Sequence, residues 1–181
     1  TGRPYPTEVL VLVDADPVFA LAEGTRLGAA LSKVPFVVAV TAYHNDSSRH
    51  ADLVVPHLHS FHRWDFNVAH TLTGHPVVTL AQPVMNAPPG IHDPYEVLRA
   101  LAGRLGGTVA QALPWASSRS AVDAVTQELF EAGKGAAFGP ANEQSWAQLL
   151  ESRGWRAPFA ANLDEFRRNI FAGGGWTDPI Y

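Results

Sequence analysis

Short apolar runs and amphipathic stretches alternate along the first part of the chain. Apolar runs rich in β-branched residues stand at residues 8–13, 35–40, 53–55 and 77–80. Unbroken apolar runs of this length predict strands that are buried on both faces. Between the first two runs, residues 18–32 have the spacing of an amphipathic helix. A strand, a helix and a second strand within residues 8–40 predict a βαβ unit, and with it a parallel sheet.

A second clear helix signal begins at Asp93. Asp93 is expected to be the N-cap, Pro94 the first helical residue and Glu96 the other half of a capping box. The helix is expected to end at Gly106 and Gly107, because glycine readily adopts the left-handed conformation that closes a helix.

The stretch after the third apolar run has a different character. Residues 57–76 are predicted to form a long, irregular loop that is rich in histidine and aromatic side chains. A loop of this length in a compact domain usually carries function or is covered by a partner. Further amphipathic helices are predicted at residues 118–131, 142–152 and 163–171. The glycine-rich and aromatic end, residues 173–181, is expected not to fold by itself.

Together these elements predict an α/β fold. A mostly parallel, Rossmann-like sheet with flanking helices is followed by a helical C-terminal extension. The predicted domains are residues 1–110 for the sheet and residues 111–181 for the extension.

Composition and charge exclude several classes of protein. The 181 residues include no cysteine, which excludes a disulfide framework, a thiolate zinc site, a cysteine nucleophile and an iron–sulfur cluster held by this chain. The formal net charge of −4 gives no basic field for a nucleic-acid partner. No apolar stretch has the length that crossing a bilayer requires.

Polar residues at the ends of the predicted strands are the first candidates for a binding site. Ligands of open parallel sheets bind beyond the carboxyl ends of the strands, and Asp14 and Asp16 follow the first strand directly. Either these carboxylates contact a ligand, or they only cap the helix that follows. The sequence contains neither a Gly-x-Gly-x-x-Gly turn nor a P-loop lysine, the two common phosphate-binding motifs.

The loop after the third strand offers a second kind of chemistry. His57, His59 and His62 could supply three nitrogen ligands to zinc or copper, or they could face solvent or a partner. Arg63 and the tryptophan after it suit a phosphate or a purine, because guanidinium is a planar donor and indole stacks. A surface salt bridge of Arg63 is the other interpretation.

An ordered set of motifs connects these pieces to a known family. The set comprises Asp-Ala-Asp-Pro at residues 14–17, Ala-Asp-Leu-Val-Val-Pro at 51–56, Phe-His-Arg-Trp-Asp at 61–65, Gln-Pro-Val at 82–84, Asp-Pro-Tyr-Glu-Val-Leu at 93–98 and Gly-Gly-Trp-Thr-Asp-Pro at 174–179. In this order they resemble the third domain of the molybdopterin oxidoreductases of the dimethyl sulfoxide reductase superfamily. The branch with polysulfide, thiosulfate and tetrathionate reductases is the most similar, and the resemblance covers nearly the whole chain.

The resemblance implies a cofactor and its contacts. The family binds two molybdopterin guanine dinucleotides around one molybdenum or tungsten, and this domain would hold one of them. A [4Fe–4S] cluster and the metal ligand would lie elsewhere in the protein. By position in the motifs, the implied cofactor contacts are Ala15, Asp16, Val40, Thr41, Arg63 and Asp93. Asp16 stands where the family usually has asparagine, and an aspartate repels a pyrophosphate.

The implied function is that of a segment of a molybdenum oxidoreductase catalytic subunit. It would serve two-electron chemistry on a small sulfur or oxygen compound, and the segment alone would be inactive. The implied partners are the rest of that subunit, an iron–sulfur electron-transfer subunit and an integral membrane quinone-reacting subunit. The implied location is the periplasmic or extracytoplasmic face of the membrane. The chain is expected to be an internal segment that leads toward a further C-terminal domain. The alternative is a cofactor-free scaffold subunit of a quinone-linked respiratory complex, similar to alternative complex III.

Overall fold

The computed structural model describes residues 6–70, 74, 76–137 and 160–178. It divides the chain into two compact units, which are described separately below. Unit 1 comprises Thr1–His59 and Ala87–Leu105, and unit 2 comprises Ser60–Asn86 and Gly106–Tyr181. The two units do not follow the predicted boundary at residue 110, because each unit contains two separate stretches of the chain. The division into domains at residue 110 stays a prediction.

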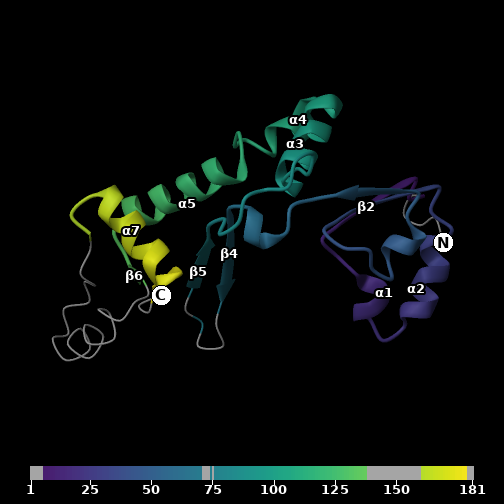
Figure 1. Cartoon of the computed structure of the whole chain (residues 1–181), viewed down its shortest axis with the longest axis horizontal. Helices are drawn as coiled ribbons and strands as arrows, with labels where there is room; N and C mark the ends of the chain where they lie inside the picture. The colour runs from purple at the N-terminus through teal and green to yellow at the C-terminus, as the bar shows by residue number, and fades with distance from the viewer. Residues whose placement is uncertain (1–5, 71–73, 75, 138–159, 179–181) are drawn as a thin grey trace. The chain divides into compact units, whose positions relative to one another are not determined.

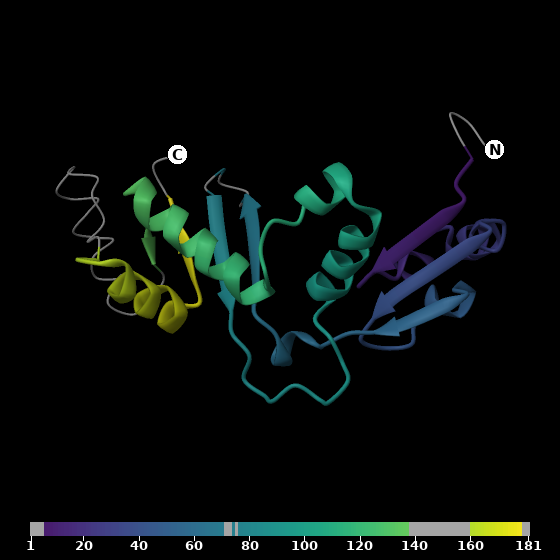
Figure 2. The ribbon, with the colours of Figure 1, turned by 90° about the horizontal axis from the view of Figure 1, so that it is seen from above.

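Unit 1 contains a three-stranded parallel sheet in the order β1-β2-β3 (Figure 2). Its strands are β1 (Val9–Val13), β2 (Phe36–Thr41) and β3 (Leu53–Pro56). Val13 pairs with Val40, and Thr41 pairs with Pro56, so the carboxyl ends of all three strands meet at one edge. The α/β class and the parallel sheet predicted from the apolar runs are therefore confirmed.

The first crossover of unit 1 is two helices rather than the single helix predicted over residues 18–32. α1 (Pro17–Ala20) and α2 (Gly24–Leu31) are separated by a short turn and lie side by side (Figure 1). A Cβ atom at Gly24 would stand 1.8 Å from the Val18 carbonyl oxygen, so this turn requires glycine. The second crossover, between β2 and β3, contains the 3₁₀ helix η1 (Ser48–His50).

Unit 2 contains an antiparallel sheet in the order β4-β5-β7-β6. Its strands are β4 (Asp65–His70), β5 (Pro76–Ala81), β6 (Ala136–Ala137) and β7 (Gly175–Thr177). Two predictions are wrong here. The stretch predicted to be an irregular loop contains β4 and the 3₁₀ helix η2 (Ser60–His62), and β5 is antiparallel to its neighbours instead of joining the parallel sheet.

The glycine-rich end of the chain is also better ordered than expected. β7 pairs with both β5 and β6, and the indole of Trp176 is buried in the core of unit 2. The Trp176 Nε1–H group donates a 3.0 Å hydrogen bond to the Lys134 carbonyl oxygen. The large apolar surface of this tryptophan therefore explains why residues 175–177 fold against the rest of unit 2.

The later helix predictions are largely correct. α3 (Pro94–Leu105) belongs to unit 1, and α5 (Ser118–Ala132) and α7 (Leu163–Gly173) belong to unit 2. α4 (Gly107–Gln111) was not predicted, because its glycine start was interpreted only as the end of α3. The helix predicted at residues 142–152 lies outside the described residues. No helix of the described residues is long and apolar enough to cross a membrane.

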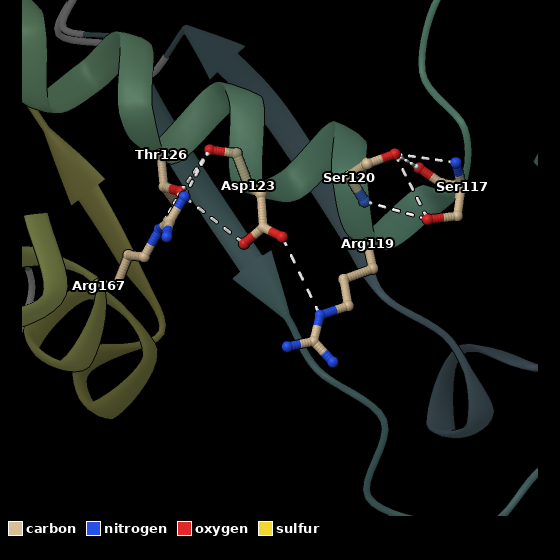
Figure 3. Close-up of polar contacts among 6 residues, drawn as sticks. All are labelled: Ser117, Arg119, Ser120, Asp123, Thr126 and Arg167. Carbon is tan, nitrogen blue, oxygen red and sulfur yellow. Dashed lines mark hydrogen bonds and ion pairs between the residues drawn. The ribbon is translucent and has the colours of Figure 1, made fainter.

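A polar contact joins α5 to α7 beside the core of unit 2 (Figure 3). The Arg167 guanidinium donates 3.2 Å hydrogen bonds to the hydroxyl of Thr126 and to the carbonyl oxygen of Asp123. It also lies 3.7 Å from the Asp123 carboxylate. At the start of α5, Ser117 and Ser120 form a reciprocal capping box that satisfies the first free N–H groups of the helix. The contacts of Arg167 therefore hold α7 against α5.

Ile170 is the residue most completely enclosed by the core of unit 2. Its side chain is 0% exposed and packs in the cluster that contains Val78, Phe166 and Trp176. We expect Ile170→Ala to lower the free energy of unfolding of unit 2 by about 2 to 5 kcal/mol, because it removes buried methyl groups and leaves a cavity. The exposed neighbour Asn169 provides the control, and Asn169→Ala should change the free energy by less than about 0.5 kcal/mol.

Tryptophan fluorescence during urea unfolding measures this effect, because the segments of unit 1 contain no tryptophan. An Ile170→Ala variant that unfolds at the same urea concentration as the parent chain would contradict the described core.

Candidate functional site

The carboxyl edge of the parallel sheet gathers most of the candidate residues of unit 1. Asp14 and Asp16 follow β1, Thr41 ends β2, and His57 follows β3. A parallel bridge between His57 and His92 brings the segment before α3 to the same edge, and the Leu58 N–H group donates to the His92 carbonyl oxygen at 2.9 Å. Four segments of unit 1 therefore meet where parallel sheets ordinarily bind ligands.

Asp16 is the most connected side chain at this edge. Its Oδ1 atom accepts hydrogen bonds from the Ser47 hydroxyl at 2.7 Å, the Ser47 N–H at 2.9 Å and the Phe19 N–H at 3.4 Å. Its Oδ2 atom accepts from the Asp46 N–H at 3.3 Å. The Ser47 side chain is 0% exposed, and its hydroxyl oxygen accepts from the Val18 N–H at 2.9 Å. The predicted role as helix cap is confirmed, and the same carboxylate also holds the loop after β2.

These hydrogen bonds stabilise the ionised form of Asp16. The Ser47 hydroxyl lowers the pKa of the Asp16 carboxyl, and the backbone N–H groups of Ser47, Phe19 and Asp46 lower it further against an opposing effect of burial. A carboxylate that accepts several hydrogen bonds holds its charge to lower pH. Asp16 is therefore a fixed negative charge at the edge of the sheet.

Asp14 meets a histidine from the end of β3. The Asp14 Oδ1 atom lies 3.3 Å from His57 Nε2, and the other ring nitrogen of His57 lies 2.8 Å from the Leu58 carbonyl oxygen. Asp14 adopts φ 49°, a left-handed conformation that is uncommon outside glycine, asparagine and aspartate. Because the backbone turns sharply at Asp14, its carboxylate lies next to His57.

The other predicted contacts of unit 1 occupy different environments. Ala15 is exposed in the loop before α1. The Val40 side chain is 2% exposed and belongs to the core, so that only its backbone faces the edge. The buried Thr41 hydroxyl donates to the Tyr43 carbonyl oxygen at 2.8 Å. The Asp93 carboxylate is buried and accepts from the Tyr95 N–H at 2.8 Å, which confirms its predicted place at the start of α3.

Arg63 belongs to unit 2, where it faces a carboxylate. Its Nη2 and Nε atoms donate to Asp65 Oδ2 at 2.9 and 3.2 Å, which is the predicted salt bridge. The ring of Trp64 meets Phe171 edge-on at 5.5 Å between centroids, and the Arg119 guanidinium lies 5.2 Å from the Trp64 ring centroid. The indole is thus engaged within unit 2. The cofactor contacts predicted for Arg63 and the five residues of unit 1 remain predictions.

The described residues do not form the histidine metal site that was considered as an alternative. His57 and His59 belong to unit 1 and His62 to unit 2. Within the part of the chain that the structure describes, no group of three or more histidine, aspartate or glutamate side chains comes together to hold a metal ion. The spacing of the three histidines in sequence does not produce a common site there.

Two features of the edge were not predicted from the sequence. Ser47 binds Asp16 across 31 positions, and a lone serine in a loop has no pattern that marks such a partner. His57 is a candidate metal ligand in the sequence, whereas in the structure its Nε2 atom lies 3.3 Å from the Asp14 carboxylate. The order of parallel strands could have suggested that pairing, because residues that directly follow neighbouring strands lie near one another.

Comparison with known proteins gives one distant relationship. No family model matches the chain. The chain is similar to a protein of a quinone-linked enzyme, the menaquinone reductase molybdopterin-binding-like subunit of Nitratidesulfovibrio vulgaris (strain Hildenborough). The identity is 31% over 106 residues, which are 59% of this chain and 15% of the relative. The match supports a relationship to molybdopterin oxidoreductases, and it does not point to the polysulfide, thiosulfate and tetrathionate branch.

The contribution of Asp16 to folding is open to a pH-dependent test. We expect Asp16→Asn to lower the midpoint of thermal unfolding of unit 1 by a few degrees at pH 7 and at pH 5. Because the pKa of Asp16 is lowered from 3.8, its stabilising effect is fully present above that value and disappears as the pH falls through the lowered pKa. The difference between the variant and the parent chain should therefore shrink below about pH 4.

Far-ultraviolet circular dichroism of the whole chain follows this transition, since unit 1 has no tryptophan. Glu23→Gln is the matched control, because Glu23 is an exposed carboxylate that pairs with Arg26 at the surface. A stability difference for Asp16→Asn that persists unchanged to pH 2 would contradict the assignment.

Proposed function

We propose that this chain is part of a molybdopterin oxidoreductase-like subunit of a quinone-linked respiratory complex, in which unit 1 acts as a protein scaffold without holding the dinucleotide. The observation that carries this proposal is the set of four hydrogen bonds at Asp16. Three backbone N–H groups and the Ser47 hydroxyl donate to this carboxylate, at the sheet edge where the resemblance places the cofactor.

The similarity to the menaquinone reductase subunit supports the first half of the proposal. That relative is described as a molybdopterin-binding-like subunit of an enzyme that reduces menaquinone. Over the matched 59% of this chain, similarity to such a subunit favours a place in a complex that exchanges electrons with quinone. The chain spans 15% of the relative's length, so any catalytic role of the whole protein is part of the proposal.

The charges at the carboxyl edge support the second half. A molybdopterin guanine dinucleotide carries a pyrophosphate, which needs N–H donors or basic side chains. At this edge, Asp14, Asp16 and Asp93 supply carboxylates instead. The pKa of Asp16 is lowered, so its charge persists at physiological pH. The residues of the edge therefore do not fit the anionic part of the cofactor.

Two arginines of unit 1, Arg26 and Arg49, form ion pairs away from Asp14 and Asp16 and do not reduce the negative charge of the edge. Arg26 pairs with Glu23 at 2.9 Å, and Arg49 lies 3.8 Å from Asp46. Both arginine side chains extend into solvent, at 83% and 80% exposure. Each is next to a carboxylate of its own loop or helix, so neither offsets the negative charge of Asp14 and Asp16.

A second candidate function retains the cofactor. The carboxylate oxygens of Asp14 and Asp93 could accept hydrogen bonds from the N1–H and N2–H₂ groups of guanine, which favours a dinucleotide-binding domain of a molybdenum or tungsten enzyme. In this candidate, the enzyme transfers two electrons to or from a small sulfur or oxygen compound. Its iron–sulfur cluster would be held by other polypeptide segments, because this chain has no cysteine.

Both candidate functions propose the same partners and the same location. An iron–sulfur electron-transfer subunit and an integral membrane quinone-reacting subunit are the proposed partners, together with the rest of the subunit itself. The proposed location is the extracytoplasmic face of the membrane.

Analysis of metal and pterin in the protein purified with its native partners distinguishes the two candidates. We expect molybdenum, tungsten and guanine released by acid hydrolysis to be far below one equivalent per subunit, because the edge offers carboxylates to a pyrophosphate. A molybdenum enzyme that binds the dinucleotide, carried through the same purification and hydrolysis, is the control for cofactor loss. About one metal and two guanines per subunit would overturn the scaffold proposal and establish the second candidate.

A further inference from the structure

The two faces of the parallel sheet in unit 1 differ in how much of them is covered. Side chains alternate between the faces along each strand, and the register places Val9 beside Phe36 and Val38 beside Leu53 on one face. Val9 is 57% exposed, Phe36 42% and Leu53 47%. On the opposite face, the Val37 side chain is 1% exposed. One face therefore belongs to the core, while the other meets solvent near the amino ends of the strands.

The uncovered part of this face carries only apolar side chains. The five residues in the first two rows of the register form the open face, namely Val9, Val11, Phe36, Val38 and Leu53. In the next row, Val40 is 2% exposed, so the chain covers this face only toward the carboxyl ends of the strands. Single exposed apolar residues are ordinary, but a contiguous apolar patch marks a surface that meets a partner. Parallel sheets, moreover, almost always have both faces covered.

The two crossovers of the sheet lie on the other face. α1 and α2 lie on one side of β2 (Figure 1). η1 contacts α2 there, because Ser32 Oγ lies 3.4 Å from His50 Nδ1, and a Cβ atom at Gly28 would stand 2.8 Å from His50 Nε2. Right-handed crossovers between strands in the order β1-β2-β3 require this arrangement, since both connections then run on the same face. The connections among the three strands therefore leave the open face without a helix.

The dimensions of the sheet fit one α-helix. Three neighbouring strands span about 10 Å across, and an α-helix with its side chains is about 10 Å in diameter. The strands contain four to six residues. They are therefore about 13 to 20 Å long, which a helix of about 9 to 13 residues covers. A second copy of the chain would instead pack sheet on sheet, which is the architecture of antiparallel sandwiches rather than of parallel sheets.

The described helices of the chain have other positions. α3 starts beside the carboxyl edge, where His92 bridges to His57. α5 and α7 contribute Val122, Phe166 and Ile170 to the core of unit 2, and α4 has only five residues. The match to the menaquinone reductase subunit covers 15% of that relative, so most of the relative's length lies outside the matched region. A subunit of such a length has further segments that can supply a helix.

We propose that the open face binds one amphipathic helix of about three turns, which belongs to the same polypeptide and lies outside residues 1–181. The helix lies along the strands and presents apolar side chains at positions i, i+3, i+4 and i+7 to Phe36, Val38 and Leu53. Its binding gives the parallel sheet its second covered face. The choice of occupant rests on the proposed function, which makes this chain part of a longer subunit.

Thiol labelling tests whether the open face is covered. The chain has no cysteine, so Leu53→Cys places a single thiol on the open face, and Glu23→Cys places one on the exposed turn between α1 and α2 as the matched control. We expect Leu53→Cys to react with a maleimide at least about tenfold more slowly in the protein purified with its native partners than in the 181-residue chain, because labelling requires the helix to leave the sheet. Glu23→Cys should react at similar rates in both preparations. Equal rates for Leu53→Cys in the two preparations, or an equal fall for Glu23→Cys, would overturn the proposal.

A photoreactive benzoylphenylalanine in place of Phe36 identifies what covers the open face. In the protein purified with its native partners, we expect mass spectrometry to find cross-links to a segment of the same polypeptide outside residues 1–181, with apolar residues at helical spacing. Cross-links to a second copy, to a separate polypeptide or to residues 1–181 would overturn the proposal. The mass of the subunit and its content of metal and guanine test the proposed function separately, so that a failure of either proposal is recognised by itself.

Discussion

The carboxylate of Asp16 is the interaction on which the arrangement of unit 1 depends. A three-stranded parallel sheet has no hairpins, so its strands are joined only by crossovers that leave and return at opposite ends. Each crossover begins with backbone N–H groups that no helix or ladder satisfies. Asp16 satisfies such groups in both crossovers at once, at Phe19 in the first and at Asp46 and Ser47 in the second. Of these donors, the N–H group of Ser47 belongs to a fully buried residue, where a missing acceptor would be costly, so the Asp16 carboxylate holds the two connections together.

The electrostatics of the edge follow from this use of a carboxylate. The hydrogen bonds to Asp16 lower its pKa, so the loop after β1 carries a permanent negative charge. The second carboxylate in that loop, Asp14, lies at ion-pair distance from His57. The charge of Asp16 is therefore stabilised by oriented N–H dipoles of the chain, and the Asp14 carboxylate lies beside an imidazole ring. An edge whose N–H donors are already bound to a carboxylate of the chain can serve a structural role. A site for an anionic ligand, by contrast, keeps its N–H donors free to bind the ligand.

The parts of the fold that could be predicted are those whose signal is local. The apolar runs at β1, β2 and β3 indicate buried parallel strands, and apolar spacing indicates α3, α5 and α7. β4 was missed although Phe66 and Val68 alternate with polar residues, which is the pattern of a half-buried strand, because it lies inside a histidine-rich stretch that reads as a loop. β7 was missed because its three residues are ordered by a partner strand about a hundred positions away. At the sheet edge, an aspartate directly after a strand could be predicted to be a candidate site residue, as Asp16 was. Its partner Ser47 could not, because the geometry of the second crossover brings it there and no local pattern encodes that geometry.

The identity of residue 16 connects this geometry to the proposed function. In the family that the chain resembles, asparagine is usual at this position, whereas in this chain Asp16 accepts hydrogen bonds from N–H donors of the two neighbouring loops. If a fold of this kind holds no dinucleotide, those donors still need acceptors, because an unsatisfied N–H group at a packed edge destabilises the fold. A carboxylate has two oxygens with lone pairs and a charge that strengthens each hydrogen bond. One aspartate can therefore supply the hydrogen-bond acceptors that an anionic ligand would otherwise offer. The four donors that bind Asp16 are satisfied in this way. An edge whose N–H donors are satisfied in this way would suit the proposed scaffold built on a cofactor-binding fold.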